Sequence, residues 1–171
     1  MKEIQLYGKN GKGLVTLVSD EDYEELNKFF WGVTKTKINM YVSRGSTYKE
    51  KTLLNYPNVV LMHRQIFNLI PGNQNIQVDH ADHDGLNNQR TNIRKCSAAE
   101  NSYNKRPFGT VSTYKGISKC SEGKYQTHLQ FKGKRITMGY FETETEAALT
   151  YNELAIKFYG EFAHLNIIID P

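Results

Sequence analysis

The stretch "VDHADHDGLNNQRTNIRKCSAAENSYNKR", residues 78–106, packs three aspartates, two histidines and several asparagines between two modest apolar runs. Asparagine forms strands poorly and helices only moderately well, so this density needs an explanation other than secondary-structure propensity. The apolar residues at its margins predict a short strand that ends at Asp79-His80, then a polar loop, then a second strand over residues 92–96.

A helix is expected to follow the second strand. Ser97 and Glu100 stand three positions apart, which is the spacing of a capping box at a helix start. Asn101 then lies in the first turns of that helix. The local order is strand, loop, strand, helix, and a histidine ends the first strand.

Such a unit suits the hydrolysis of phosphodiester bonds. The reaction needs a base that activates water and a cation that stabilises the crowded, negatively charged phosphorus. A neutral imidazole such as that of His80 is an effective base near neutral pH. A carboxylate and an amide carbonyl are ligands for a hard cation such as Mg²⁺ or Mn²⁺, which completes its shell with water and phosphate oxygens.

The pattern resembles the HNH nucleases, and more closely their phage and intron-encoded homing endonucleases. Asp79-His80 is followed by Asn92, twelve residues after His80, and by Asn101, twenty-two after Asp79. The segment "DGLNNQRTNIR", residues 84–94, is similar to the family's loop, and its Asn87 and Asn88 are interpreted as turn residues. The resemblance implies a ββα-metal (His-Me finger) centre with His80 as general base, Asn92 as the residue that orients it, and Asp79 and Asn101 as ligands of Mg²⁺ or Mn²⁺. No zinc is expected, because the cysteine pairs that hold structural zinc in some relatives are absent.

Three other interpretations of the stretch stay open. Asp82, Asp84 and Gly85 partly imitate a calcium loop, although the first and last ligand positions do not fit. A zinc site formed by His80, His83, Cys96 and Cys120 matches no common ligand spacing. The third interpretation is a purely structural loop that has lost its chemistry.

Residues 1–60 are predicted to form an α+β scaffold segment, followed by the nuclease region over residues 61–106. Strands are expected within 13–19, 38–45 and 58–67, the last running into a helix, and a helix over 20–31. His63, beside Arg64 in an apolar run, is interpreted as a structural histidine. No apolar run reaches the roughly 18 residues that span a bilayer, and the N-terminus has no secretory h-region.

After a linker over residues 107–112, the segment 113–171 is predicted to be a three-stranded antiparallel sheet packed on one helix. Residues 124–131 and 135–140 alternate between apolar and polar side chains, and a lysine-glycine turn joins them. The alternation places Ile136, Met138 and Tyr140 on the inner face. A capping box at Thr143 opens a helix with an apolar stripe, which ends at Gly160. The stripe consists of Ala147, Ala148, Tyr151, Leu154, Ala155, Phe158 and Tyr159.

The outer face of this sheet is predicted to contact a polyanion. Residues 100–135 include eight basic side chains and two acidic ones. The net charge of this segment is therefore +6, compared with +4 for the whole chain. Alternation alone places His128, Gln130, Arg135 and Thr137 on that face. The alternative is that this face packs against the nuclease region.

The segment also resembles the plant ethylene-response-factor (Apetala-type) DNA-binding domain. The resemblance rests on the runs "YKGI" (114–117), "MGYF" (138–141), "EAA" (146–148) and "YG" (159–160). That family lays its sheet in the major groove of DNA. The positions on the DNA side would be Lys115, Ser118, Cys120, Glu122, His128, Gln130, Arg135 and Thr137. Arg135 can read guanine and Gln130 adenine, whereas Lys115, Lys132 and Lys134 are assigned to phosphates.

The sequence therefore predicts a metal-dependent endonuclease that acts on double-stranded DNA in the cytoplasm of a bacterial or phage-infected cell. The competing hypothesis is a non-catalytic DNA-binding regulator that retains a relic centre. No membrane partner is expected, and monomer and homodimer are both left open.

Overall fold

The computed structural model describes residues 1–69, 75–107, 112–120 and 122–168. Residues 108–111, which form most of the predicted linker, lie outside the described residues. The chain divides into two compact units, Met1–Ala98 and Ala99–Pro171. Each unit mixes helices with small, mostly antiparallel sheets, as expected for an α+β protein. Within the described ranges, no helix has the length and apolar character needed to cross a membrane.

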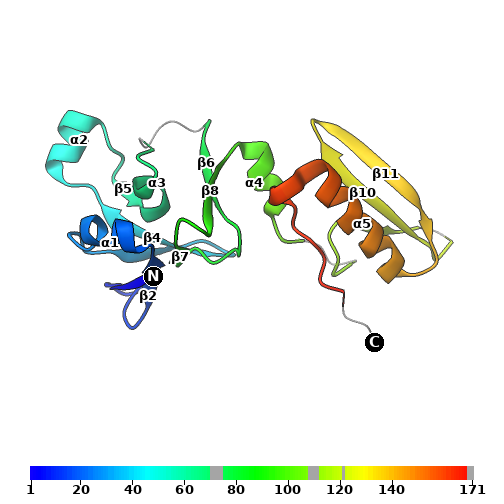
Figure 1. The fold of residues 1–171 in the computed structure, drawn as a ribbon, viewed down its shortest axis with the longest axis horizontal. Coiled ribbons are helices and arrows are strands. Elements are labelled where there is room, and N and C mark those ends of the chain that lie inside the picture. Colours follow the sequence, from blue (N-terminus) through cyan, green and yellow to red (C-terminus); the bar gives the residue numbers. More distant parts are fainter. Residues whose placement is uncertain (70–74, 108–111, 121, 169–171) are drawn as a thin grey trace. The chain divides into compact units, whose positions relative to one another are not determined.

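The first unit contains three small sheets and three short helices among its described residues (Figure 1). Its elements are β1 (Lys2–Gln5), β2 (Val15–Val18), α1 (Asp20–Leu26), β3 (Gly32–Lys35), β4 (Met40–Gly45), α2 (Tyr48–Leu54), β5 (Val59–Leu61), α3 (Met62–Ile66), β6 (Gln77–His80), β7 (Asn87–Asn88) and β8 (Ile93–Cys96). The strand orders are β1-β2-β7, β3-β4-β5 and β6-β8. The pairs are antiparallel except for β2 with β7, which is parallel.

The predicted helix over residues 20–31 is shorter than expected. It ends at Leu26, and Trp31 instead bridges to Leu6 with its indole nitrogen donating to the Leu26 carbonyl at 2.8 Å. The burial of the indole in the core therefore overrides the helical pattern, and Asn27 caps the C-terminal end of α1. The elements β1, β3, β7 and α2 were not predicted.

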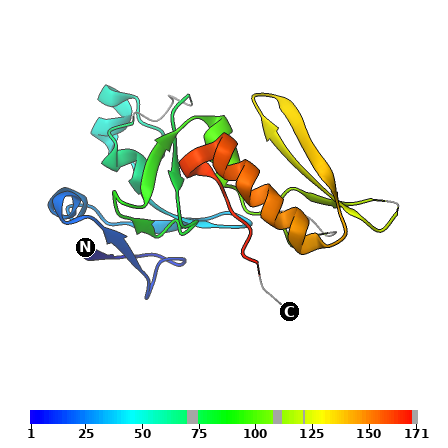
Figure 2. The same ribbon diagram turned by 45° about the vertical axis from the view of Figure 1, so that its right-hand side comes forward.

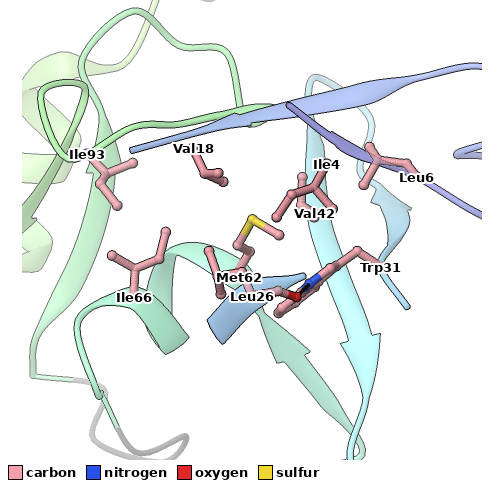
Figure 3. Close-up of a cluster of buried hydrophobic side chains, with 9 residues drawn as sticks. All are labelled: Ile4, Leu6, Val18, Leu26, Trp31, Val42, Met62, Ile66 and Ile93. Carbon is pink, nitrogen blue, oxygen red and sulfur yellow. Dashed lines mark hydrogen bonds between the residues drawn. The ribbon is translucent and has the colours of Figure 1, made fainter. Parts of the chain in front are cut away.

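The core of the first unit draws on most of its elements (Figure 3). Trp31 and Met62 are fully buried at its centre, and Ile93 closes it from β8. Its members are Ile4, Leu6, Val18, Leu26, Trp31, Val42, Met62, Ile66 and Ile93. Side chains from the predicted scaffold segment (residues 1–60) and from the predicted nuclease region thus share one core, which packs β6 and β8 against the N-terminal strands.

A buried arginine fastens α2 and α3 to β4. The Arg44 guanidinium donates to both carboxylate oxygens of Glu50, at 2.8 and 2.6 Å, and to the Gln65 amide oxygen. Glu50 also closes the capping box that begins α2. Hydrogen bonds from Arg44 are the main reason that the pKa of Glu50 falls to about 2.

In the second unit a sheet packs on one helix, as the sequence predicts (Figure 2). Its elements are α4 (Ala98–Asn104), which begins at the last residue of the first unit, β9 (Ile117–Lys119), β10 (Tyr125–Phe131), β11 (Lys134–Phe141), α5 (Glu144–Tyr159) and a final 3₁₀ turn (Gly160–Phe162). The strand order is β11-β10-β9, all antiparallel. The Thr143 capping box is present, and the predicted apolar stripe of α5 faces the sheet.

The alternation predicted for β11 is wrong at its end. Thr127 pairs with Met138 but Tyr125 pairs with Phe141, so β11 holds one extra residue near Gly139, whose φ is +48°. This β-bulge leaves Tyr140 exposed and brings Phe141 to the core instead. Met138 is also exposed, because β11 is an edge strand.

Candidate functional site

The hairpin of β6 and β8 presents the Asp79-His80 pair. Antiparallel pairing sets Asp79 opposite Arg94 and His80 opposite Ile93. Arg94 donates from both Nε and Nη2 to one carboxylate oxygen of Asp79, at 3.0 and 2.7 Å, and the two side chains are largely buried. A buried ion pair with this geometry holds the Asp79 carboxylate in a fixed direction.

The buried side chain of His80 is surrounded by two aromatic rings and a side-chain amide. Its Nε2 is 3.4 Å from Oδ1 of Asn88, and its ring lies against those of Tyr41 and His63. Burial lowers the pKa of His80, and this effect outweighs the opposing influence of Asn88 and of the carboxylates of Asp82, Asp79 and Asp84. The imidazole is therefore neutral near pH 7, which is the state that can accept a proton.

The amide beside the imidazole belongs to Asn88, a residue interpreted from the sequence as a turn former. Asn88 is fully buried, and its side-chain nitrogen donates to Thr16 Oγ1 at 3.0 Å and to the Gly85 carbonyl at 3.3 Å. The main chain of Asn87 and Asn88 pairs with β2, which draws this part of the loop into the first unit. The partner Thr16 stands 72 positions away, so local sequence carries no signal for it.

The expectation that Asn92 bonds the imidazole does not match the structure. Its amide nitrogen donates to Asp82 Oδ1 at 2.9 Å and to the Asn87 carbonyl at 2.8 Å, and its oxygen accepts from the Asp82 amide. Both amide hydrogens are thus committed to the loop. Asn92 supports the site by closing the loop, whereas Asn88 makes the contact to His80.

Hydrogen bonds to the Asp82 carboxylate hold the loop together. The Asp82 carboxylate accepts from the Asp84 amide and from the side chains of Asn87 and Asn92. Burial raises the pKa of Asp82, but these hydrogen bonds outweigh it and lower the pKa overall. Three protein donors therefore meet the carboxylate that the calcium interpretation would use. No group of three or more His, Cys, Asp or Glu side chains converges as a metal site within the described residues.

The two predicted metal ligands belong to different units. Asp79 lies in the first unit, and Asn101 lies on α4 in the second. Their side chains supply oxygen donors, and Mg²⁺ commonly binds with one or two protein ligands plus water and phosphate. One oxygen of the Asp79 carboxylate is already engaged by Arg94.

The outer face of the second sheet carries cross-strand pairs of polar groups. His128 pairs with Thr137, Gln130 with Arg135, and Gln126 with Ser118. Ser118 Oγ lies 3.4 Å from His128 Nδ1, while burial, followed by the Arg135 charge, lowers the pKa of His128. Gln130, Arg135 and Thr137 are exposed, as are Lys132 and Lys134 at the hairpin turn. Cys120 and Glu122, also predicted for this face, lie beyond the end of β9.

Lys115 makes contacts that its assignment to DNA phosphate did not anticipate. Its ammonium donates to the carbonyls of Tyr103 and Lys105, at 2.5 and 2.6 Å, at the end of α4. Burial, with a smaller contribution from the Lys105 charge, lowers the pKa of Lys115 to about 8. Lys115 therefore caps a helix, a role set by a fold-dependent contact.

Comparison with known proteins identifies the family of the chain. It is 32% identical over 161 residues to an uncharacterized HNH endonuclease of Acanthamoeba polyphaga mimivirus, covering 92% of this chain and 78% of that protein. The chain belongs to the HNH endonuclease family. The Asp79-His80 pair of this HNH protein lies at the end of β6.

A second relative of this HNH protein is a plant protein named for binding a dehydration-responsive element. A stretch of 63 residues is 40% identical to dehydration-responsive element-binding protein 2D of Arabidopsis thaliana, covering 36% of the chain and 31% of the plant protein. No family model matches the chain. No solved structure matches it either.

Proposed function

We propose that this chain is a metal-dependent HNH endonuclease that hydrolyses phosphodiester bonds in duplex DNA. The observation that carries the proposal is the buried, neutral imidazole of His80 at the end of β6, next to the fixed carboxylate of Asp79. A neutral imidazole beside a directed carboxylate supplies the base and one metal ligand of a hydrolytic centre.

His80 accepts a proton from water, and the resulting hydroxide oxygen forms a bond to phosphorus. The bond from phosphorus to the 3′ oxygen breaks, and that oxygen takes up a proton to give a 3′-hydroxyl and a 5′-phosphate. Asn88 and the ring neighbours of His80 fix the base, and Arg94 fixes the direction of Asp79. Mg²⁺ or Mn²⁺, with Asp79 and Asn101 as proposed ligands, supplies charge stabilisation at the phosphate when bound.

The second unit is proposed to hold the duplex through the outer face of its sheet. Arg135 and Gln130, paired across β10 and β11, present donors and acceptors that match base edges. Lys132 and Lys134 flank them at the turn and suit phosphates, which fix register without reading sequence. The plant relative, named for binding a DNA element, supports this assignment.

Cleavage of supercoiled plasmid in Mg²⁺ tests the proposal. Wild-type protein should nick or linearise the plasmid, and His80→Ala should reduce the rate by about 10²- to 10⁴-fold, the usual contribution of a general base. His83→Asn is the matched control, because it removes a second histidine of the same loop while asparagine tolerates its φ of +65°. EDTA should stop cleavage and leave binding of the duplex intact.

The alternative function is a non-catalytic DNA-binding regulator. It would be supported if wild-type protein left the plasmid intact in both Mg²⁺ and Mn²⁺ while still shifting a duplex in a gel. One centre per chain cuts one strand at a time, so a nicked product is expected before any linear product. A linear product appearing without a nicked precursor would instead indicate two centres acting together.

A further inference from the structure

His63 is a buried histidine that is interpreted from the sequence as structural, without a specific role. It lies in the first turn of α3 with 5% of its surface exposed, between the core residue Met62 and Arg64. Its Nδ1 has no hydrogen-bond partner among the described residues. Buried polar atoms normally have a hydrogen-bond partner, and Nδ1 of His63 is an exception.

The contacts that His63 does make are with rings. Its centroid is 5.1 Å from that of His80, with the planes at 88°, and 5.8 Å from that of Tyr41, at 69°. Tyr41 in turn lies 5.9 Å from His80. The three rings come from β4, α3 and β6, and each contacts the other two. The two contacts of His63 are edge-to-face and that between Tyr41 and His80 is tilted by 47°, and ring contacts at these distances favour particular ring orientations.

The amide contact to His80 does not fix the imidazole by itself. The separation of 3.4 Å between His80 Nε2 and Asn88 Oδ1 is longer than a normal hydrogen bond between nitrogen and oxygen. An imidazole rotates about the bond to its Cβ unless neighbours prevent it, and this rotation moves both ring nitrogens. Ring packing by His63 and Tyr41 is a structural feature that restricts the rotation.

We propose that His63, together with Tyr41, is a positioning residue that fixes the plane of the His80 imidazole for proton transfer. The proposal rests on the proposed function, since it assigns His63 a role only through His80. His63 acts by the shape of its ring and not by its charge. Burial lowers the pKa of His63 to about 3, so its ring is uncharged at neutral pH and is not a cationic phosphate ligand.

Two substitutions separate ring shape from nitrogen chemistry. His63→Phe keeps a flat ring at the same place, whereas His63→Ala removes it. In single-turnover cleavage at saturating protein, the rate constant of His63→Phe should stay within about threefold of wild type, and that of His63→Ala should fall by about tenfold or more. The dissociation constant for DNA should stay within about twofold in both variants, because His63 is buried and does not reach the duplex.

Ile66→Ala is the matched control for a general loss of packing. Ile66 is buried in the same helix, but it belongs to the core cluster and not to the three rings. This variant should melt at a lower temperature and keep the wild-type rate constant when assayed well below its melting point. A rate constant for Ile66→Ala as low as that of His63→Ala would overturn the proposal. The proposal would also be overturned if His63→Phe and His63→Ala slowed cleavage equally, or if neither variant slowed it.

A second measurement keeps the test valid if the protein does not cut DNA. The chain has five histidines, so the ring resonances of His80 can be assigned by NMR in the full-length protein. Wild type and His63→Phe should each give one narrow His80 signal, and His63→Ala should give a shifted or broadened one. An unchanged His80 signal in His63→Ala overturns the positioning role, whereas absence of cleavage in wild type with the expected spectra overturns the proposed function alone.

Discussion

Asn88 and Asn92 carry the same side chain four positions apart, but their surroundings give them different roles. Asn88 is buried between Thr16 and His80, and Asn92 joins Asp82 to the main chain of the loop. The buried amide of Asn88 contacts the proposed base His80, so its loss should affect proton transfer directly. The amide of Asn92 bonds the loop, so its loss should affect proton transfer only through the shape of the loop.

Single alanine substitutions at the two asparagines should therefore differ in kind. Asn92→Ala should lower the free energy of unfolding by about 1–2 kcal/mol, because three hydrogen bonds are lost at a partly exposed position. Its single-turnover rate constant for DNA cleavage should stay within about threefold of wild type. Asn88→Ala should lower that rate constant further than Asn92→Ala does, measured at a temperature where circular dichroism shows both variants folded. A lower rate constant for Asn92→Ala than for Asn88→Ala would instead indicate that Asn92 orients His80.

The Arg44–Glu50 pair makes the stability of the first unit dependent on acid. The pKa of Glu50 is about 2 in the folded protein and 4.5 in its ordinary state. The stabilisation is thus complete above pH 4.5 and is lost as the pH falls towards 2. At pH 7, Glu50→Gln should lower the free energy of unfolding by about 2 kcal/mol, because it leaves the buried Arg44 poorly compensated. Urea titrations should show the difference from wild type shrinking between pH 4.5 and 2, and a constant difference would contradict the assignment.

At the scale of single residues, the sequence predicts what local pattern determines. The strand end at Asp79-His80 follows from hydrophobic spacing, and the structure has β6 end there. The roles of Asn88, His63 and Lys115 depend on partners that folding brings from distant positions, such as Thr16, Tyr41 and Tyr103. No local periodicity records those pairings.

At the scale of elements, the helix α5 and the strand β10 were predicted well because each is long enough for its period to repeat. Ala147, Tyr151 and Ala155 recur at helical spacing and are all buried against the sheet. β7 has two residues and β3 has four, which is too short for alternation to be distinguished from chance. The bulge in β11 escaped prediction because a single extra residue reverses every side chain after it.

Two glycines of the second unit test how α5 meets the sheet. Gly116 has a φ of +75°, and a Cβ there would lie 2.3 Å from the Tyr151 ring on α5. Gly133 has a φ of +77° in the hairpin turn, and a Cβ there would meet no atom within 4 Å. Gly133→Ala should cost about 1 kcal/mol for its backbone, and Gly116→Ala about 2–4 kcal/mol, because the clash adds to the same backbone cost. Equal melting temperatures for the two variants would contradict the close packing of Tyr151.

At the scale of the whole molecule, the proposed general base and the proposed DNA-binding face lie in separate units. His80 belongs to Met1–Ala98, and Arg135 belongs to Ala99–Pro171. The excess of positive charge between residues 100 and 135 falls in the second unit. Binding and cleavage should therefore respond to different substitutions.

Arg135→Ala should weaken binding to a preferred duplex by about 5- to 150-fold, the value of one good bidentate contact to a base. It should leave the single-turnover rate constant nearly unchanged once protein is saturating. Lys157→Ala is the control, because it removes an exposed positive charge from α5 and not from the sheet. Fluorescence anisotropy with several duplex sequences measures the effect. Equal weakening by both variants would reduce the role of Arg135 to general electrostatics.

The contacts of α4 bear on how such a protein can be recombined. The ring of Tyr103 stacks on that of Tyr159 at 3.9 Å, and Lys115 binds the carbonyls at the end of the same helix. The helix that carries Asn101 thus belongs structurally to the second unit. A chimera joined within residues 107–112 would separate α4 from the side chains that secure it. A functional exchange of the second unit between relatives would have to be spliced near Ala98, so that the incoming unit brings its own α4.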